Sequence, residues 1–335
     1  MILMIYAIAF IMAFVMVLLL MPLFSRMAEK LDFTDKPTER KKHTSPVPLA
    51  GGAVMFVAFA VGFILFVAVG PVVAPSIVRG SIDTDGLWVI IPGATMIIGI
   101  GLIDDFYKTR GRDFPVWPRI LVQICAAVLA FAAGIRFTGF MNPFTDNYVY
   151  FHIVLQFGLT VLWFVGLVTV FNFMDGLDGL AGMLAMLSGC TLFIVALAMN
   201  QSDSAFMAVL FVGVVTGFLR HNLPPAKVFM GDSGAYLLGY LLAAISLHGA
   251  FKQATVISVF IPILAMGVPI FESARVFVQR IRARQPVHVA DSSSKTTYFH
   301  HRLVMAGMKP PYALALIVLV SACLNLTAII LMLVF

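Results

Sequence analysis

Long apolar runs follow one another along almost the whole chain, separated by short stretches rich in charge, glycine or proline. A helix that crosses a bilayer needs about 20 consecutive apolar residues. The runs predict about ten spans, at roughly 2–24, 48–70, 87–103, 118–135, 150–171, 178–199, 204–220, 233–249, 254–279 and 312–334. The expected fold class is therefore all-α, a polytopic transmembrane helix bundle forming a single domain over residues 1–335.

The composition excludes an ordinary soluble domain. The chain is 61% hydrophobic and 11% charged, against about 45–50% and about 25% in soluble proteins. Its net charge of +6 does not indicate nucleic acid, because cytoplasmic loops of membrane proteins carry excess Lys and Arg. Cys125, Cys190 and Cys323 stand alone in apolar runs, a pattern typical of packing residues. Residues 1–23 have no basic start and are interpreted as a retained first helix.

Basic residues gather on one side of the predicted bundle. Every Lys and Arg except Arg79, Arg136 and Lys252 lies on the side of the loops that follow odd-numbered spans. The positive-inside rule makes that side cytoplasmic and places both termini outside. The acidic residues on or near the same side are Asp35, Asp104, Asp105, Asp175, Asp178, Asp232, Glu272 and Asp291. Acids and bases on one face predict an active-site cleft at the cytoplasmic surface of the lipid bilayer.

Asn172–Gly182 reads N-F-M-D-G-L-D-G-L-A-G and lies between two apolar runs. Carboxylates such as Asp175 and Asp178 are costly near hydrocarbon. Carboxylates found at the edge of a membrane span usually bind a metal, a proton or a polar substrate. The alternative is an interhelical turn in which an aspartate caps a helix.

The third span ends in G-L-I-D-D-F-Y-K, with Asp104 and Asp105 adjacent. Neighbouring carboxylates repel unless a cation compensates them, and acids at a helix C-terminus oppose its dipole. Mg²⁺ is often bound by one or two carboxylates together with substrate phosphates. The pair therefore favours a magnesium site, and Lys108 is a candidate phosphate contact.

Three loops add polar groups. In P-P-A-K-V-F-M-G-D-S-G-A, from Pro224, Asp232 lies between glycines where a helix should begin, which suits a phosphate–metal pair or a simple N-cap. The first loop, from Asp35, ends in P-V-P-L-A-G-G, which indicates a backbone that approaches another segment closely. Its basic cluster could equally bind lipid headgroups. Y-F-H-H-R-L near residue 300 suits a pyrophosphate clamp or proton transfer.

Together these motifs resemble the polyprenyl-phosphate N-acetylhexosamine-1-phosphate transferases, the family that includes the bacterial enzyme making lipid I and the enzyme starting O-antigen chains. The matching segments are D-K-P-x-x-R-K-x-H, P-x-x-G-G, D-D, N-F-M-D-G-L-D-G-L, K-V-F-M-G-D-S-G and H-H-R-L. They cover the chain from about residue 30 to about residue 310. N-F-M-D-G-L-D-G and D-K-P are closer to the GlcNAc-1-phosphate branch.

The resemblance implies a cytoplasmic cleft and a Mg²⁺ cofactor, for which Mn²⁺ could substitute. It implies Asp232 and Asp105 as metal ligands, Asp104 as the base toward the lipid phosphate, and Phe229 stacked on uracil. The implied catalytic residues are Asp104, Asp105, Asp232, His300 and His301. The implied substrate-binding residues are Lys108, Asn172, Asp175, Asp178, Phe229, Arg302 and His43.

Two positions depart from the family pattern. Tyr298 replaces the first histidine of H-x-H-H, and Glu272 replaces the aspartate of P-x-x-D, which begins here at Pro269. Both lie in a segment expected to bear on sugar choice, so the donor could be an unusual UDP-sugar.

The function expected is transfer of N-acetylhexosamine-1-phosphate, with GlcNAc favoured, from a UDP-sugar to undecaprenyl phosphate. The reaction would release UMP at the bacterial inner membrane and begin a cell-surface polysaccharide. Direct attack is favoured over a phosphoaspartyl intermediate, and a homodimer is left open. The alternative is an ion-coupled transporter whose acids relay protons. A CDP-alcohol phosphotransferase would carry a D-G-x-x-A-R pattern, which this sequence lacks. A purely structural membrane scaffold would not explain why the acidic residues lie on one side of the bundle.

Overall fold

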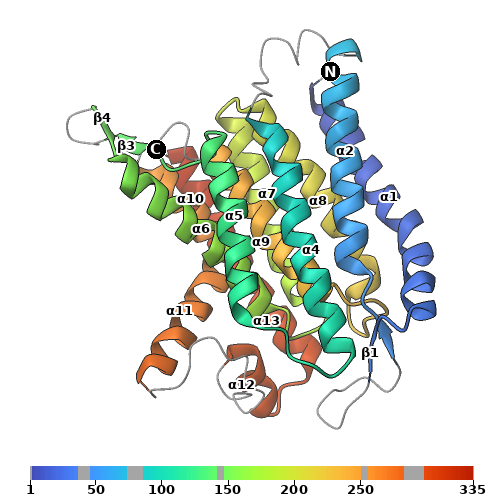
Figure 1. Ribbon diagram of the computed structural model, residues 1–335. Helices are drawn as coiled ribbons and strands as arrows, with labels where there is room; N and C mark the ends of the chain where they lie inside the picture. The colour runs from blue at the N-terminus through green and yellow to red at the C-terminus, as the bar shows by residue number, and fades with distance from the viewer. Residues whose placement is uncertain are drawn as a thin grey trace.

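The computed structural model describes residues 2–36, 46–73, 86–141, 147–249, 256–282 and 298–334. Figure 1 shows a bundle of helices with two small hairpins. Seven helices in these ranges are long and apolar enough to cross a membrane. The predicted all-α polytopic fold is confirmed.

The elements follow in chain order. The helices are α1 (Ile2–Lys30), α2 (Gly51–Val73), η1 (Leu87–Val89), α4 (Ile90–Thr109), α5 (Val116–Ala132), α6 (Ile153–Met174), α7 (Leu180–Ala198), α8 (Ser202–Asn222), α9 (Gly231–His248), α10 (Val256–Ala265), α11 (Gly267–Arg282), α12 (Phe299–Met305) and α13 (Pro310–Val334). Two antiparallel hairpins pair β1 (Thr34–Asp35) with β2 (Val47–Pro48), and β3 (Gly139–Met141) with β4 (Tyr148–Tyr150).

The core is built around α8 and α9, whose side chains are buried on nearly all sides. A helix that is apolar all round suits such a position. Helix α9 packs against α4 and α6, and α8 packs against α1 and α7. Small residues let the backbones approach: a Cβ on Gly101 of α4 would lie 2.4 Å from the Cα of Ser233. This contact brings the end of α4 against the start of α9.

The single span predicted at 254–279 is wrong, because α10 and α11 are separate helices with a break at Met266. Pro269 has no N–H to donate to the carbonyl of Ala265, four residues earlier. That carbonyl instead accepts hydrogen bonds from Ser188 Oγ at 2.8 Å and from Asn325 Nδ2 at 3.1 Å. Neighbouring helices therefore satisfy the backbone group that the proline releases.

Other span ends also shift. Helix α1 continues to Lys30 and α4 to Thr109, past the predicted ends at 24 and 103. Asp104 and Asp105 therefore lie inside the last turns of α4 rather than beyond it.

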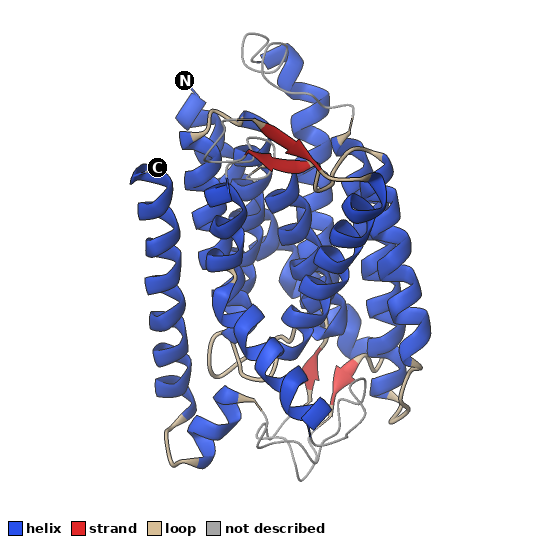
Figure 2. Ribbon diagram, turned by 90° about the vertical axis from the view of Figure 1, so that its left-hand side faces the viewer, coloured by secondary structure: helices blue, strands red, loops and turns tan. Residues whose placement is uncertain are grey.

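The two ends of the bundle differ. Figures 1 and 2 show both termini at the same end of the bundle as the β3–β4 hairpin, and the β1–β2 hairpin at the opposite end. Helix α12 also lies at the β1–β2 end in Figure 1. Because the helices alternate in direction, the end of α4 and the starts of α5 and α9 meet at this second end. The predicted acidic motifs are therefore gathered at one end of the bundle.

Candidate active site

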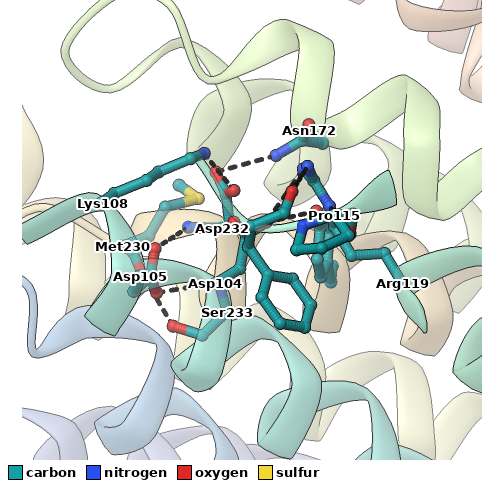
Figure 3. A network of polar contacts seen from close by, with 11 residues as sticks. Asp104, Asp105, Lys108, Pro115, Arg119, Asn172, Met230, Asp232 and Ser233 are labelled. Carbon is teal, nitrogen blue, oxygen red and sulfur yellow. Dashed lines mark hydrogen bonds and ion pairs between the residues drawn. The ribbon is translucent and has the colours of Figure 1, made fainter. Parts of the chain in front are cut away.

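Helices α4, α6 and α9 bring together predicted site residues that are far apart in sequence. Figure 3 shows Asp104, Asp105 and Lys108 of α4 facing Asp232 at the start of α9, with Asn172 of α6 beside them.

Asp105 of α4 binds the first turn of α9. Its Oδ1 accepts the backbone N–H of Asp232 at 2.7 Å, and its Oδ2 accepts that of Ser233 at 3.1 Å. The first amides of a helix have no partner within the helix, so a carboxylate there satisfies them and suits the helix dipole. Gly231 has a positive φ of 69°, and a Cβ there would lie 2.4 Å from Asp105 Oδ2. Only glycine fits this turn.

The Asp232 carboxylate is bound on both oxygens. Lys108 Nζ forms an ion pair with Oδ2, and Asn172 Nδ2 donates to Oδ1 at 3.0 Å. The Asp232 side chain is 13% exposed and that of Lys108 is 46% exposed. The pair therefore lies at the accessible rim of the cluster, where a charged substrate can reach it.

Asp104 lies deeper, with no exposed surface. Its Oδ2 pairs with Arg119 Nη1 of α5 at 3.0 Å and accepts the hydroxyl of Tyr236 of α9 at 3.0 Å. Its Oδ1 is buried and has no hydrogen-bond partner.

Arg119 and Tyr236 were not predicted as site residues. Arg119 belongs to none of the recognised motifs. Tyr236 lies four residues after Asp232, and a spacing of four places two side chains on one helix face. That spacing is the one sequence signal that could have identified it.

Asp175 and Asp178 lie in the turn between α6 and α7 and differ in their surroundings. Asp175 ends α6 and its surface is accessible. The pKa of its carboxyl is nevertheless raised, to about 8, first by desolvation from the surrounding protein and then by the negative charges of Asp232 and Asp105. Asp178 Oδ2 accepts the N–H of Ala226 at 3.0 Å. Asp178 therefore fixes the loop that leads to α9.

The loop before α9 is bound by the first loop of the chain. Phe229 N–H donates to the carbonyl of Pro48 at 3.0 Å, and Gly51 N–H donates to the carbonyl of Phe229 at 3.0 Å. A Cβ on Gly52 would lie 2.5 Å from the backbone nitrogen of Gly234. The close backbone approach predicted for P-x-x-G-G is confirmed, and the segment approached is the start of α9.

Helix α12 lies next to the end of α6. The ring centroids of Tyr298 and Phe173 are 5.8 Å apart, and Phe173 follows Asn172 in α6. Phe299 N–H donates to Glu272 of α11, which also accepts from Arg275 Nη2 at 2.7 Å. The two departures from the family pattern, Glu272 and Tyr298, are thus neighbours at the start of α12.

The other predicted residues of this region are only partly described. His301 and Arg302 lie on α12, and His301 contacts the ring of Tyr298 at 6.3 Å between centroids. The side chain of His300 and the whole of His43 lie outside the described residues.

The cluster fits a divalent cation that prefers oxygen. Within the described ranges no group of three or more His, Cys, Asp or Glu side chains converges. Mg²⁺ does not require such a cage, because it is often held by one or two carboxylates plus substrate phosphates. Asp104 Oδ1 is a buried acceptor without a donor, and Lys108 supplies the positive charge beside Asp232. Both oxygens of Asp105 already accept backbone N–H groups.

Comparisons with known proteins identify the same region. Residues 87–250, which include Asp104 and Asp232, match the glycosyl transferase family 4 model. A Bacillus subtilis protein named probable undecaprenyl-phosphate N-acetylglucosaminyl 1-phosphate transferase is 32% identical over 325 residues, covering 97% of this chain and 84% of the relative.

More distant relatives share most of the chain as well. The decaprenyl-phosphate N-acetylglucosaminephosphotransferase of Mycobacterium tuberculosis is 30% identical, over 84% of this chain and 71% of the relative. The phospho-N-acetylmuramoyl-pentapeptide-transferase of Streptococcus mutans is 27% identical, over 90% of this chain and 88% of the relative. The chain is a multi-pass membrane protein that belongs to glycosyl transferase family 4.

Proposed function

We propose that the protein transfers N-acetylhexosamine-1-phosphate, with GlcNAc as the sugar, from a UDP-sugar to undecaprenyl phosphate. The reaction releases UMP and leaves the first lipid-linked intermediate of a cell-surface polysaccharide. The observation that carries the proposal is the meeting of Asp104, Lys108 and Asp232 at one end of a membrane bundle. The names of the relatives support the same reaction.

Transfer brings two anionic substrates together, and the proposed site offers positive charge for them. Lys108 is exposed enough to exchange Asp232 for a substrate phosphate. The His301 and Arg302 side chains of α12, with His300 and His43, are proposed to hold the pyrophosphate. Positive groups placed where charge gathers lower the barrier of such a reaction.

Asp232 is the proposed ligand of Mg²⁺, because its carboxylate lies at the accessible rim. A bound Mg²⁺ would polarise the phosphoryl oxygens and offset their charge. Asp105, the second predicted ligand, uses both oxygens to hold the backbone of Asp232 and Ser233. Asp105 is therefore proposed first to position Asp232. The remaining lone pairs of the Asp105 oxygens stay open to the metal.

Asp104 is the proposed base toward the lipid phosphate, through its partnerless Oδ1. Asp104 Oδ1 would take the proton of the lipid phosphate, and the oxygen that loses it attacks the phosphorus that carries the sugar. The new P–O bond forms as the pyrophosphate P–O bond breaks, and UMP departs with the bridging oxygen. Direct attack needs one base and one metal ligand, and Asp104 and Asp232 fill these two places without a covalent enzyme intermediate.

The nucleotide is assigned to the rim around the end of α6. Asn172, Asp175 and Phe229 are the proposed contacts, Phe229 by stacking on uracil. Asp178 contributes by holding the loop that carries Phe229, since it accepts the N–H of Ala226.

The proposed location is the bacterial inner membrane, with the β1–β2 end facing the cytoplasm and both termini outside. Lys30, Lys108 and Arg220 lie in the last turns of α1, α4 and α8 at that end. Arg136 lies between α5 and the β3–β4 hairpin. This charge distribution agrees with the positive-inside rule. A lipid acceptor also accounts for a polar site at the end of a membrane bundle.

The test is a reaction in nanodiscs containing undecaprenyl phosphate and a panel of labelled UDP-sugars. We expect UMP release matched by a lipid-linked sugar, with UDP-GlcNAc the best donor and no reaction in EDTA. Absence of UMP release with every donor would contradict the function. Movement of a substrate across proteoliposomes without UMP release would instead support the transporter.

A further inference from the structure

The buried hydroxyl of Tyr236 has no role in the mechanism above. We propose that Tyr236 is a positioning residue that fixes the orientation of Asp104 relative to Asp232. This inference rests on the proposed function, because Asp104 must act on the substrate for its orientation to matter.

Tyr236 and Asp232 lie on the same face of α9, one turn apart. The Tyr236 side chain is 3% exposed, and its hydroxyl donates to Asp104 Oδ2 at 3.0 Å. Asp104 itself belongs to α4. The bond therefore connects the proposed base on one helix to a rigid point on the helix that carries the proposed metal ligand.

The two carboxylate oxygens of Asp104 differ in their partners. Oδ2 receives both Tyr236 and Arg119, whereas Oδ1 is buried without a partner. A carboxylate bound by two donors on one oxygen cannot rotate freely, so it keeps the other oxygen in one place. Buried polar atoms in native structures nearly always find partners, and a substrate would supply the one that Oδ1 lacks.

Arg119 alone would not fix this geometry. Its guanidinium group is anchored at the start of α5, where Nε donates to the carbonyl of Pro115 at 3.2 Å and Nη2 to that of Phe114. Arg119 is thus held by α5, which does not carry Asp232, and it also interacts with the Tyr236 side chain. Tyr236 instead attaches Asp104 Oδ2 to α9, beside Asp232, whose own carboxylate also interacts with that of Asp104.

Tyr240 provides a matched control. It lies one turn beyond Tyr236 on α9 and is 1% exposed, but its hydroxyl has no hydrogen-bond partner. Tyr236→Phe and Tyr240→Phe remove the same atom from the same helix at similar burial. Only the first removes a bond to Asp104.

The experiment measures kcat, both KM values and the thermal midpoint for the two variants. We expect Tyr236→Phe to lower kcat about tenfold, with KM for the UDP-sugar and for undecaprenyl phosphate unchanged. Tyr240→Phe should keep the wild-type kcat. A general structural role would instead lower the thermal midpoint and raise KM in both variants.

The inference is overturned if Tyr236→Phe keeps the wild-type kcat, or if Tyr240→Phe loses as much. In both results the wild-type protein still transfers the sugar phosphate, so the proposed function stands. A wild-type protein inactive with every UDP-sugar would overturn the proposed function, and the positioning role with it.

Discussion

The backbone N–H of Asp232 donates to Asp105 Oδ1 across 2.7 Å, so the last turns of α4 hold the first turn of α9. The D-D pair and the G-D-S-G turn, which are far apart in sequence, are one structural unit. Asp105 caps a helix that is not its own, and the Asp232 side chain is thereby held beside Lys108.

This relationship predicts that Asp105 and Asp232 fail in different ways when they are changed. Asp105→Ala leaves two backbone amides without an acceptor, the buried one of Ser233 and the partly buried one of Asp232, and a buried amide left unpaired costs about 1–3 kcal/mol. We expect a lower thermal midpoint together with lost turnover. Asp105→Asn should show an intermediate loss, since its single carbonyl oxygen can replace only one acceptor. An Asp105→Ala variant with wild-type stability would contradict the capping role.

Lys108 is expected to compete with Mg²⁺ for Asp232. The Lys108→Met variant removes the ion pair, so Asp232 should bind Mg²⁺ more tightly in the absence of substrate while turnover falls. Calorimetric titration with MgCl₂ and the UMP-release assay measure the two effects. Lys108→Arg, which keeps the positive charge, is the control and should stay closer to wild type in Mg²⁺ affinity. Weaker Mg²⁺ binding by Lys108→Met would argue against competition.

Glu272 and Tyr298 are expected to affect the choice of sugar. Glu272 accepts the N–H of Phe299, and Tyr298 lies against Phe173, so both determine where α12 lies beside α6. Tyr298→His restores the residue expected from the family pattern. It should shift the ratio of kcat/KM between UDP-GlcNAc and the other UDP-sugars by about tenfold, a change in barrier of about 1.4 kcal/mol.

Glu272→Gln keeps an acceptor for Phe299 but loses the ion pair with Arg275. It should change the donor ratio less than Tyr298→His does. If neither variant moves the ratio, α12 has no part in sugar choice.

The polar network at the α10–α11 break is expected to contribute to stability. Asn325 bonds the carbonyl of Ala265 and accepts from Thr191 Oγ1 at 2.6 Å. Asn325→Leu should lower the free energy of unfolding by about 1–2 kcal/mol, as for hydrogen bonds between membrane helices. Thr327→Val is the control, because Thr327 is exposed on the same helix and its hydroxyl donates to the carbonyl of Cys323 within that helix. Equal losses in the two variants would show that the network has no special role.

The sequence predicted the bundle and much of the cluster because apolar periodicity and motif residues are local signals. Asp104, Asn172 and Asp232 could be expected to meet once their segments were assigned to one side of the membrane. The break at Met266 was missed because residues 254–279 are mainly apolar and read as one span. The helix can break before Pro269 because Ser188 and Asn325 of other helices bond the Ala265 carbonyl that the proline leaves without a donor. Arg119 was missed because its ion pair with Asp104 depends on how α5 packs against α4, which no local sequence pattern indicates. The capping of α9 by Asp105 depends on the close contact at Gly101, which no motif reveals.

The proposed active site is tested by sugar-phosphate transfer in wild type and Asp232→Asn, measured as UMP and lipid product across a range of Mg²⁺ concentrations. We expect equal amounts of both products from wild type, dependence on Mg²⁺, and a loss of at least about 100-fold in Asp232→Asn. Asp232→Asn should remain folded, because its backbone N–H still donates to Asp105. A wild-type rate for Asp232→Asn at low Mg²⁺ would contradict the assignment of Asp232 to the metal, and with it the proposed active site.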